Sequence, residues 1–241
     1  MKPASRVSIR LAKHPLPPEA DKKGRHRSFK IVCLSDTHGF HRHLRVPDGD
    51  VLIHAGDFMN HGRSITEVED FDDWLDELPH RHRIVVAGNH DLLFESDPTA
   101  ARSRLTNAVY LENTGVALEG FRFWGCPVTP VLTHMAFSVE RGAASREYWD
   151  QIPEGTDVLI THGPPFGTLD NDEIGEPHMG CQDLTRAILR VKPRLHVFGH
   201  VHGAYGKVLG PNGTSMVNCA LLNGAALKQP IVVELSGKTE C

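Results

Sequence analysis

Short apolar runs bounded by turn residues recur along most of the 241-residue chain. Several of these runs are nearly continuous in Val, Ile and Leu, which indicates strands buried on both faces of a sheet. The pattern predicts strands at Phe29–Ser35, Val51–Ala55, Arg83–Ala87, Phe121–Cys126, Asp157–Thr161, Leu195–Phe198, Ser215–Ala220 and Ile231–Leu235.

Helical spacing of apolar residues occurs between some of these strands. It is clearest over Ser64–Leu78, where Ser64 and Glu67 have the spacing of a capping box at the start of a helix. A second helix is predicted at Gln182–Val191 and a short one around Ser145–Trp149. Strands that alternate with helices predict an α/β layer fold, and the later run of strands without strong helices predicts a second sheet packed on the first.

The stretch between Cys126 and Pro153 has a poorer pattern, which Pro127 and Pro130 interrupt. Apart from the short helix, we expect irregular structure there. Such a segment could form part of a substrate rim, because binding residues are often carried on loops that a rigid scaffold positions.

Length and composition fit one globular domain. Hydrophobic residues make up 40% of the chain and charged residues 23%, which is ordinary for a globular protein. A chain of this size can bury a substantial core. No apolar run approaches the roughly 20 residues that a helix needs to cross a bilayer, so no membrane-spanning segment is expected.

Charge is distributed unevenly along the chain. Residues 1–28 contain eight Lys and Arg against two acidic residues, so the formal net charge of −4 leaves −10 for residues 29–241. We therefore predict a basic N-terminal extension over 1–28 and a single domain over 29–241. Val7, Ile9 and Leu11 alternate with other residues, which favours a strand over a targeting segment. The acidic body disfavours a long nucleic-acid partner, which needs a broad basic surface.

The five cysteines include no pair with the C-x-x-C spacing of a zinc or redox motif. An odd number without such spacing indicates free thiols in a reducing compartment, so we expect a cytoplasmic location. Cys33 lies inside an apolar run and is predicted to pack in the core.

Acidic residues and imidazoles follow the first two predicted strands. Asp36 and His38 end the first, and their spacing of two would point both side chains to the same side of an extended chain. Gly56 and Asp57 end the second, where the glycine permits a sharp turn and the carboxylate could bridge two cations. His54, inside the second strand, is predicted to be structural. Taken alone, each pattern is more typical of a turn than of a metal site.

The third block, Gly88-Asn89-His90-Asp91, is less generic. Asn89 offers a neutral carbonyl oxygen, and His90 can act as an acid near neutral pH. Asp91 could orient an imidazole. Three such groups in succession indicate chemistry rather than a simple turn.

Further histidines follow two later strands. His162 precedes a loop stiffened by two prolines, and His200 and His202 follow the strand that ends at Phe198. His196, inside that strand, is predicted to be structural. Other histidines on predicted loops could reach a substrate, but we expect them to be mainly solvated; they are His41, His43, His134 and His178.

Together these blocks place seven candidate ligands at the same end of successive strands, which is where open α/β sheets bind ligands. The seven are Asp36, His38, Asp57, Asn89, His162, His200 and His202. Seven ligands without a thiolate are too many for one tetrahedral zinc ion, and imidazole mixed with carboxylate suits a pair of transition-metal ions. We therefore predict two divalent cations, most favourably Mn, with Fe, Zn or Co as alternatives. Such a pair can clamp an in-line displacement at phosphorus.

The blocks D-x-H, G-D, G-N-H-D, a central His and G-H-x-H, in this order, resemble the calcineurin-like metallophosphoesterase superfamily over roughly Lys30 to Gly203. The phrases Phe71-Asp72-Asp73-Trp74-Leu75 and Thr161-His162-Gly163-Pro164-Pro165 further resemble its brain-type metallophosphoesterase-domain branch, which is similar to class III cyclic-nucleotide phosphodiesterases. Protein Ser/Thr phosphatases carry a D-R-G extension after the G-D block. Here Phe58-Met59-Asn60 follows instead, which argues against that substrate class.

The resemblance implies a four-layer sandwich of two facing mixed β-sheets flanked by helices. It also implies that Asp57 bridges two ions, with Asp36, His38 and His202 completing one site and Asn89, His162 and His200 the other. His90 and Asn89 would be catalytic. A metal-bridging hydroxide would attack the phosphorus in line, His90 would protonate the leaving oxygen, and Asn89 would contact both metal and phosphate.

We expect the substrate to be a small phosphodiester, cyclic nucleotides included. Phosphomonoester hydrolysis is the alternative enzymatic function. A non-catalytic metal-binding scaffold is the alternative of another class, although such proteins commonly lose a ligand or the third-block histidine, whereas Asn89 and His90 are both present. Neither a membrane nor long nucleic acid is expected as a partner, and the sequence leaves the oligomeric state open.

Overall fold

The computed structural model describes residues 28–131, 135–171, 178–224 and 226–237. The predicted strand around Val7 lies outside the described residues. The division of the chain into an extension and a domain at residue 28 stays a prediction.

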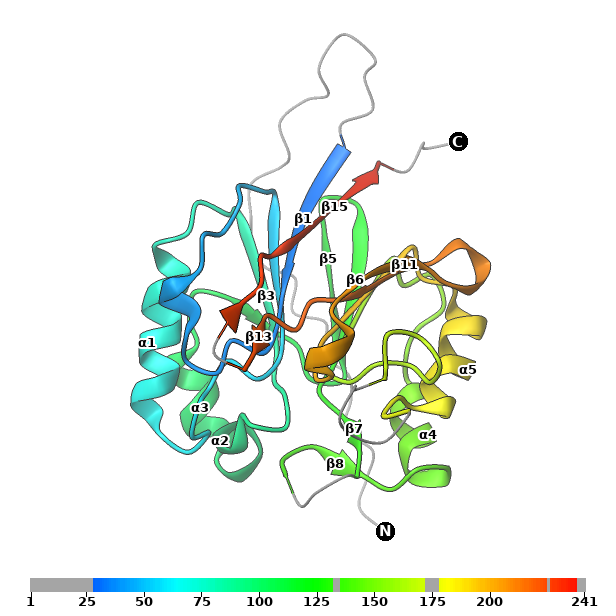
Figure 1. The fold of residues 1–241 in the computed structure, drawn as a ribbon, viewed down its shortest axis with the longest axis horizontal. Coiled ribbons are helices and arrows are strands. Elements are labelled where there is room, and N and C mark those ends of the chain that lie inside the picture. The colour runs from blue at the N-terminus through cyan, green and yellow to red at the C-terminus, as the bar shows by residue number, and fades with distance from the viewer. Residues whose placement is uncertain (1–27, 132–134, 172–177, 225, 238–241) are drawn as a thin grey trace, which may run out of the picture.

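The first of two large sheets has five strands in the order β15-β1-β2-β3-β4 (Figure 1). Its parallel strands are β1 (Ser28–Leu34), β2 (Val51–Ala55), β3 (His82–Val86) and β4 (Val109–Tyr110). The last strand, β15 (Ile231–Ser236), pairs antiparallel with β1 and forms one edge. Helices or a second sheet cover both faces, which explains why these strands read as apolar runs.

The second large sheet has six strands in the order β11-β12-β10-β9-β6-β5. Its central strands are parallel; they are β12 (Ser215–Asn218), β10 (Leu195–Phe198), β9 (Val158–Thr161) and β6 (Phe121–Cys126). Both edges are antiparallel, with β11 (Gly206–Leu209) on β12 and β5 (Thr114–Leu118) on β6. The sheet is therefore mixed, like the first.

Alternation along the strands divides the core into layers. On β1, Ile31 packs in a cluster that also contains Ile160 and Val197 from the second sheet, so this cluster fills the space between the two sheets. The next residue, Val32, belongs to a cluster with Phe71 on the outer face of the first sheet. Successive strand residues point to opposite faces, so a strand in the middle of the sandwich has to be apolar on both.

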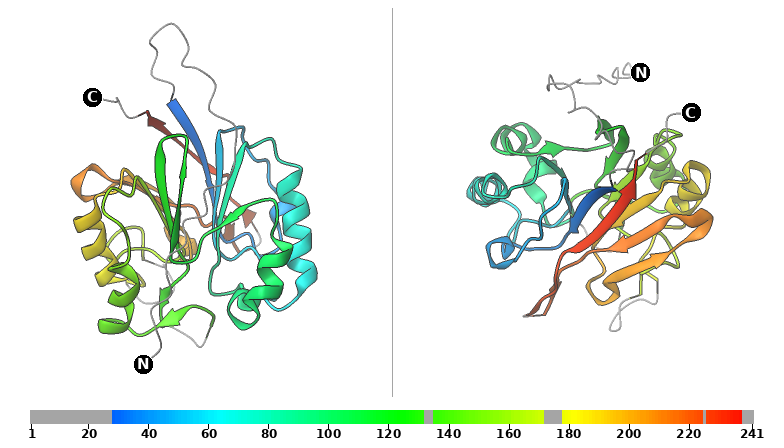
Figure 2. Two further views of the ribbon diagram at one scale, coloured as in Figure 1. Left: turned by 180° about the vertical axis from the view of Figure 1, so that it is seen from behind. Right: turned by 90° about the horizontal axis from the view of Figure 1, so that it is seen from above.

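Helices cover the outer face of each sheet (Figure 2). Beside the first sheet lie α1 (Ile65–Asp76), α2 (Leu92–Ser96) and α3 (Pro98–Arg104), and beside the second lie α4 (Ala143–Trp149) and α5 (Gln182–Val191). The arrangement has four layers, helix, sheet, sheet and helix. The predicted four-layer sandwich of two facing mixed sheets is confirmed.

Shorter elements complete the described chain. Three 3-10 helices occur, at η1 (His41–His43), η2 (His202–Ala204) and η3 (Pro211–Gly213). Two small two-stranded sheets pair β7 (Thr129–Pro130) with β8 (Ser138–Val139) and β13 (Leu222–Asn223) with β14 (Ala226–Leu227). In the portion of the chain that the structure covers, no helix has the length and apolar character needed to traverse a bilayer.

All predicted strands and helices from residue 28 onward are confirmed, with boundaries that differ by at most two residues. The predicted capping box is wrong in its second half. Ser64 does accept a hydrogen bond from the backbone of Thr66, but Glu67 does not bond back to Ser64. Its carboxylate instead accepts the backbone N–H groups of Asn60, His61 and Gly62, so it orders the loop that precedes the helix.

Candidate metal centre

The candidate ligands come from loops at the carboxyl ends of β1, β2, β3, β9 and β10. Backbone and side-chain hydrogen bonds join these loops. The amide of Asp36 donates to the Gly56 carbonyl oxygen at 2.9 Å, and the amide of His200 donates to the Asp36 carboxylate at 2.9 Å. The second of these bonds connects the two sheets. Because parallel strands end at the same edge, side chains from both sheets converge on one place.

Four of these loop residues have a left-handed backbone. Their φ angles are 54° at Asp36, 43° at His38, 56° at Asp57 and 68° at His200. Non-glycine residues rarely adopt this region, and such backbone strain clusters at functional sites. The prediction that Asp36 and His38 lie on one side of an extended chain is therefore wrong. The two side chains meet because the loop coils, and not because a strand alternates.

Two glycines leave room for the ligand side chains. A Cβ atom on Gly88 would lie 2.3 Å from Oδ1 of Asp57 and 2.7 Å from the His162 ring. A Cβ atom on Gly199 would lie 2.1 Å from Oδ2 of Asp36. Such separations are far below van der Waals contact, so these positions exclude any side chain.

The first group of side chains contains Asp36, His38 and His202, whose ligand atoms all lie within 4.8 Å of one another. Nε2 of His202 lies 3.3 Å from Oδ1 of Asp36, and the rings of His38 and His202 are 5.4 Å apart. Asp36 and His38 are buried, while His202 is partly open to solvent. These are three of the four residues predicted to hold one cation.

The second group contains Asn89, His162 and His200. Nε2 of His162 lies 2.8 Å from Oδ1 of Asn89, and the rings of His162 and His200 are 5.0 Å apart. All three derive from different strands, so the arrangement depends on tertiary packing. They are the predicted ligands of the other cation, apart from Asp57.

Asp57 lies between the two groups. Its Oδ2 atom is 3.8 Å from Nε2 of His38 and 3.4 Å from Nε2 of His162. Its other oxygen, Oδ1, accepts the backbone N–H of His90 at 2.7 Å. One carboxylate oxygen thus faces an imidazole from each group, which is the position required of a bridging ligand.

Unpartnered atoms indicate that the site suits cations. Oδ1 of Asp36 and Nε2 of His200 are buried and make no well-aligned hydrogen bond within the described residues; the polar atom beside Oδ1 is Nε2 of His202, 3.3 Å away. Leaving such acceptors unsatisfied costs about 1–3 kcal/mol each, and more for a charged group. Carboxylate oxygens and imidazole lone pairs are good ligands for divalent transition metals. The side chains present therefore fit the predicted pair of cations, and their roles as ligands stay a prediction.

The imidazole of His162 has a fixed orientation. Its Nδ1 atom lies 2.9 Å from the Ala55 carbonyl oxygen, which can only accept, so Nδ1 must carry a hydrogen. Nε2 is then the nitrogen that faces Asn89 and Asp57. Metal-binding histidines commonly donate their second N–H to a carbonyl in this way, which fixes the tautomer.

The electrostatic surroundings of His162 also favour positive charge at this position. Burial opposes protonation of this ring, but the nearby Asp57 carboxylate outweighs it and raises the pKa of His162 to about 10. Positive charge at Nε2, from a proton or from a cation, is therefore favoured between the Asn89 and Asp57 oxygens. Metal ions bind in competition with protons at such ligands. By contrast, burial lowers the pKa of His200 to about 4, which keeps that imidazole neutral.

Asp91 has a role that the sequence did not reveal. It was expected to orient an imidazole, but its buried carboxylate accepts three backbone N–H groups instead, from Asp57 at 2.9 Å, Met59 at 2.9 Å and Gly88 at 2.7 Å. The carboxylate thereby ties the loop after β2 to the loop after β3. A buried Asp directly after the G-N-H block was the available signal, but its backbone partners cannot be read from one sequence.

The predicted catalytic histidine lies at the mouth of the site. His90 is partly exposed, whereas Asn89 beside it is buried. The His90 ring lies 4.8 Å from the His38 ring at an interplanar angle of 90°, and its ligand atoms also approach Asp57. His90 can therefore reach a molecule bound over the two groups.

The other histidines for which the sequence suggested a role differ in burial. His54 and His196 are fully buried, and each lies next to a threonine hydroxyl, so their predicted structural role agrees with the structure. His41 was expected to be solvated, but it is buried and bonded to Asp70, because η1 turns it under α1. His43 is exposed, and His178 is half-exposed and paired with Asp170. His134 lies outside the described residues.

Comparison with known proteins places these features in a family. A family model for the calcineurin-like phosphoesterases matches residues 29–204. Metallophosphoesterase domain-containing protein 1 of Homo sapiens is 40% identical over 247 residues, covering 92% of this chain and 74% of that protein. A UPF0046 protein of Caenorhabditis elegans is 39% identical over 227 residues, covering 88% of this chain and 77% of that protein.

The chain therefore belongs to the calcineurin-like phosphoesterase family. The 40% sequence identity to metallophosphoesterase domain-containing protein 1 also confirms the resemblance to the metallophosphoesterase-domain branch. The crystal structure of TT1561 of Thermus thermophilus superposes with a TM-score of 0.55 at 16% identity, covering 81% of this chain and 92% of that one. At that identity the likeness supports the fold alone. Family membership and the ligand groups together support a metal-binding hydrolase.

Proposed function

We propose that this protein is a dinuclear metal-dependent phosphodiesterase that hydrolyses small phosphodiesters, cyclic nucleotides included. The observation that carries the proposal is the position of Asp57, whose Oδ2 atom lies within 4 Å of one imidazole nitrogen from each ligand group. A carboxylate placed in this way can hold two cations a few ångströms apart, as in-line displacement at phosphorus requires.

The residues fit a pair of divalent transition-metal ions, and we propose Mn as the most favourable, with Fe, Zn or Co as alternatives. When bound, such ions lower the pKa of water and offset the charge of a phosphate group. Asp36, His38 and His202 would complete one site around Asp57, and Asn89, His162 and His200 the other.

His90 and Asn89 would act on the substrate directly. His90 is partly exposed at the mouth of the centre, and its backbone is held by Asp57. It would therefore donate a proton to the leaving oxygen as the phosphorus–oxygen bond breaks. The Asn89 carboxamide has its oxygen on the His162 side, so its NH₂ group is available to donate to a phosphate oxygen.

A leaving-group comparison tests the proposed acid. The variant His90→Ala, loaded with Mn²⁺, should hydrolyse a phosphodiester with an alkyl leaving group about 10²–10⁴-fold more slowly, which is the usual contribution of a positioned acid. A p-nitrophenyl leaving group needs little protonation, so the loss there should be much smaller. Equal losses with both leaving groups would contradict the acid role. Unchanged metal content, measured by elemental analysis, separates His90 from the ligands.

Two alternatives have distinct outcomes. Faster hydrolysis of p-nitrophenyl phosphate than of bis(p-nitrophenyl) phosphate, with Mn²⁺ present, would favour a phosphomonoesterase. A metal-loaded preparation that is inactive on aryl diesters, aryl monoesters and cyclic nucleotides alike would favour a non-catalytic scaffold. We propose a small diester over long nucleic acid because residues 29–241 carry a net charge of −10.

A further inference from the structure

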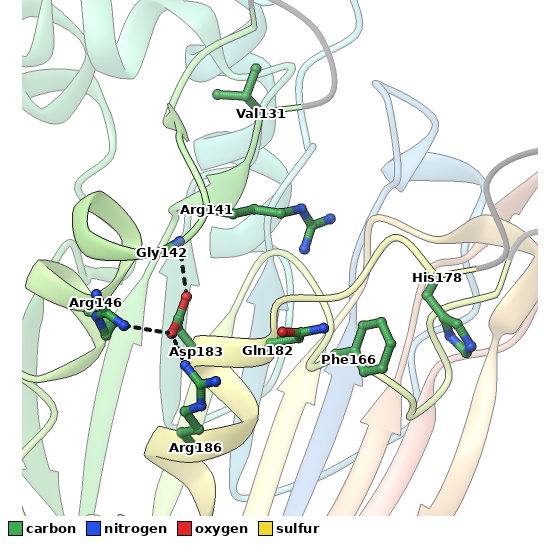
Figure 3. Close-up of a pocket in the computed structure, with 9 residues that line it drawn as sticks. All are labelled: Val131, Arg141, Gly142, Arg146, Phe166, His178, Gln182, Asp183 and Arg186. Atoms are coloured by element: carbon green, nitrogen blue, oxygen red, sulfur yellow. Dashed lines mark hydrogen bonds and ion pairs between the residues drawn. The ribbon is translucent and has the colours of Figure 1, made fainter.

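A cavity of about 660 Å³ lies next to the helices of the second sheet, and none of the candidate metal ligands lines it. Its walls come from the segment between β8 and α4, from the start of α5 and from the loop that follows His162 (Figure 3). This volume is in the range of small-molecule binding pockets. The lining includes three arginines, Arg141, Arg146 and Arg186.

Two of the segments that form these walls are connected to the candidate metal centre, one through the chain and one through a hydrogen bond. The loop that carries Phe166 begins at His162. The segment that leads to Arg141 contacts Asn89, because the backbone N–H of Ala136 donates to the Asn89 carbonyl oxygen at 3.2 Å. The loop after His162 and the segment bonded to Asn89 thus both contribute to the cavity wall, and these two residues are the parts of the centre that are linked to it.

The described residues that line the cavity carry an excess of positive charge. Asp183 supplies the one carboxylate among its described lining residues. Oδ1 of Asp183 is shared by Arg186 at 2.7 Å and Arg146 at 3.9 Å, and Oδ2 accepts the backbone N–H of Gly142 at 3.0 Å. Three guanidinium groups thus line the cavity beside one carboxylate, and two of them, those of Arg186 and Arg146, already share it, within a body whose net charge is negative.

Arg141 is held in place without being neutralised. Its Nη1 and Nη2 atoms donate to the carbonyl oxygens of Gly180 at 2.6 Å and Met179 at 3.2 Å. Carbonyl oxygens carry no net charge, and no carboxylate of a described residue forms an ion pair with Arg141. A guanidinium has five N–H donors, so several remain free. A fixed guanidinium with free donors can bind a phosphate or carboxylate with two parallel hydrogen bonds.

An aromatic wall lies beside the guanidinium groups. Phe166 is 37% exposed, and its ring lies 4.6 Å from the ring of His178. The buried Asp170 carboxylate fixes this wall, because it lies 3.1 Å from Nδ1 of His178 and accepts the backbone N–H of Gly167 at 2.8 Å. Flat rings next to a cation suit a ligand that carries its anionic group on a sugar or a ring.

We infer that this cavity is a subsite for a second anionic group, which a substrate carries apart from the phosphodiester that is cleaved. The inference rests on the proposed function for the reaction, and it narrows the substrate class to phosphodiesters with a further phosphate or carboxylate. Such a group offsets the excess charge of the arginines and occupies the free donors of Arg141. The segment predicted as a substrate rim, between Cys126 and Pro153, then contributes through Arg141 and Arg146.

Two chromogenic substrates that differ in one group test this inference. They are the p-nitrophenyl ester of thymidine 5′-phosphate and the same ester with an added 3′-phosphate. With the full Mn²⁺-loaded chain, the 3′-phosphorylated substrate should have the lower KM. Arg141→Gln should raise that KM about ten- to hundredfold, as expected for the loss of a hydrogen bond between charged groups. The KM of the other substrate, and kcat for both, should change little.

Two further variants separate binding from folding. Arg186→Gln removes a guanidinium that makes no bond to the 179–180 backbone, so it should act in the same direction as Arg141→Gln without disturbing that loop. Arg104→Gln changes an exposed arginine on α3, paired with Glu69 on the far side of the molecule, and should preserve the preference for the 3′-phosphate. Equal losses on both substrates in Arg141→Gln would make it a structural residue and overturn the inference.

Calorimetric binding of thymidine 3′,5′-bisphosphate and thymidine 5′-phosphate to the same preparations provides a readout that does not need turnover. Tighter binding of the bisphosphate, lost in Arg141→Gln, supports the subsite even if neither ester is hydrolysed, and in that case the phosphodiesterase proposal fails alone. Equal affinity of the wild-type protein for both nucleotides would overturn the subsite, whatever the enzymatic activity.

Discussion

Nε2 of His162 faces Oδ1 of Asn89 at a distance of 2.8 Å, while Nδ1 of the same ring donates to a backbone carbonyl. The Asn89 oxygen is an acceptor, and the nearby Asp57 carboxylate is another. The ring nitrogen can satisfy both only with a proton or a cation between them. A proton and a metal ion therefore compete for the same position at Nε2.

Metal binding should stabilise the fold. Two buried carboxylates, Asp36 and Asp57, repel each other at the centre, and divalent cations would offset that repulsion. Mn²⁺ at 100 times the Kd of a site should add about 2.7 kcal/mol to the free energy of unfolding for each site that it fills. Thermal unfolding at a series of Mn²⁺ concentrations, with a chelator as baseline, measures this increment. In Asp57→Asn most of it should vanish; an equal rise in that variant would contradict the bridging position.

Asp91→Asn should weaken both the fold and metal binding. The substitution turns an NH₂ group toward at least one of the three backbone N–H groups that the buried Asp91 side chain accepts, and leaves that donor without an acceptor. A buried polar group without a partner costs about 1–3 kcal/mol, so we expect a loss of that size in unfolding free energy. Metal affinity should fall roughly 10–100-fold, as for other residues that orient ligands.

Asp72→Asn is the matched control. The Asp72 carboxylate is also buried and accepts backbone and side-chain donors from Thr106 and Asn107, but it lies on α1, away from the centre. Its substitution should lower the free energy of unfolding without changing metal affinity, which calorimetric titration with Mn²⁺ measures. Parallel losses of metal affinity in both variants would show that general destabilisation explains the effect of Asp91.

Gly88→Ala should abolish metal binding, because the new methyl group would overlap Asp57 and His162. Gly163→Ala provides the comparison, since it also adjoins His162 but its nearest atom would be a methyl of Thr129 at 3.2 Å. That methyl needs to shift only a few tenths of an ångström, so this variant should retain its metal. Elemental analysis of both purified proteins measures their metal content. Full metal content in Gly88→Ala would contradict the close packing.

Stability should fall with acidification, in part through His196. Burial lowers the pKa of His196 to about 3, against an ordinary value of 6.5. Between these values the unfolded chain binds a proton there and the native protein does not, so stability decreases as pH falls from 6.5 toward 3. Each pH unit corresponds to at most about 1.4 kcal/mol for this one group.

His196→Gln isolates that contribution. The Thr161 hydroxyl donates to the Gly163 carbonyl oxygen, so it accepts from Nε2 of His196, and glutamine can supply an equivalent donor. Denaturant unfolding at pH 7 and pH 5 should show a smaller loss of stability in the variant, by about 1–2 kcal/mol. An identical loss in both proteins would exclude His196 as a source of the acid sensitivity.

The sequence predicted those parts of the fold that depend on local apolar patterns. Strands such as β2 and β6 were located to the residue, because each is a mostly apolar run with clear turn residues beside it. Short elements were missed. The helices α2 and α3 follow the third block within a stretch interrupted by Pro98, and β5 carries mostly exposed residues at a sheet edge, so neither has a strong period.

The ligand types and their convergence could also be predicted, but the way in which they converge could not. Asp36 and His38 meet through left-handed backbone turns, which sequence spacing does not encode. The Asp91 side chain accepts from the amide of Asp57, 34 residues away, and that of Glu67 from the amide of Asn60, seven residues away; such partners depend on how the loops fold. The arginine cavity joins segments about 40 residues apart, so none of its charges formed a recognisable motif.

The pairing of β1 with β15 places the two ends of the described sandwich side by side. Ser28 is directly opposite Ser236, and residues paired in this way are about 5 Å apart. Both lie at the amino end of β1, whereas the metal loops leave its carboxyl end. A circularly permuted protein could join Ser236 to Ser28 through a short linker and have its new termini at Gly120, between β5 and β6. Both the new linker and the new termini would then lie at the end of the sheets that is remote from the metal centre.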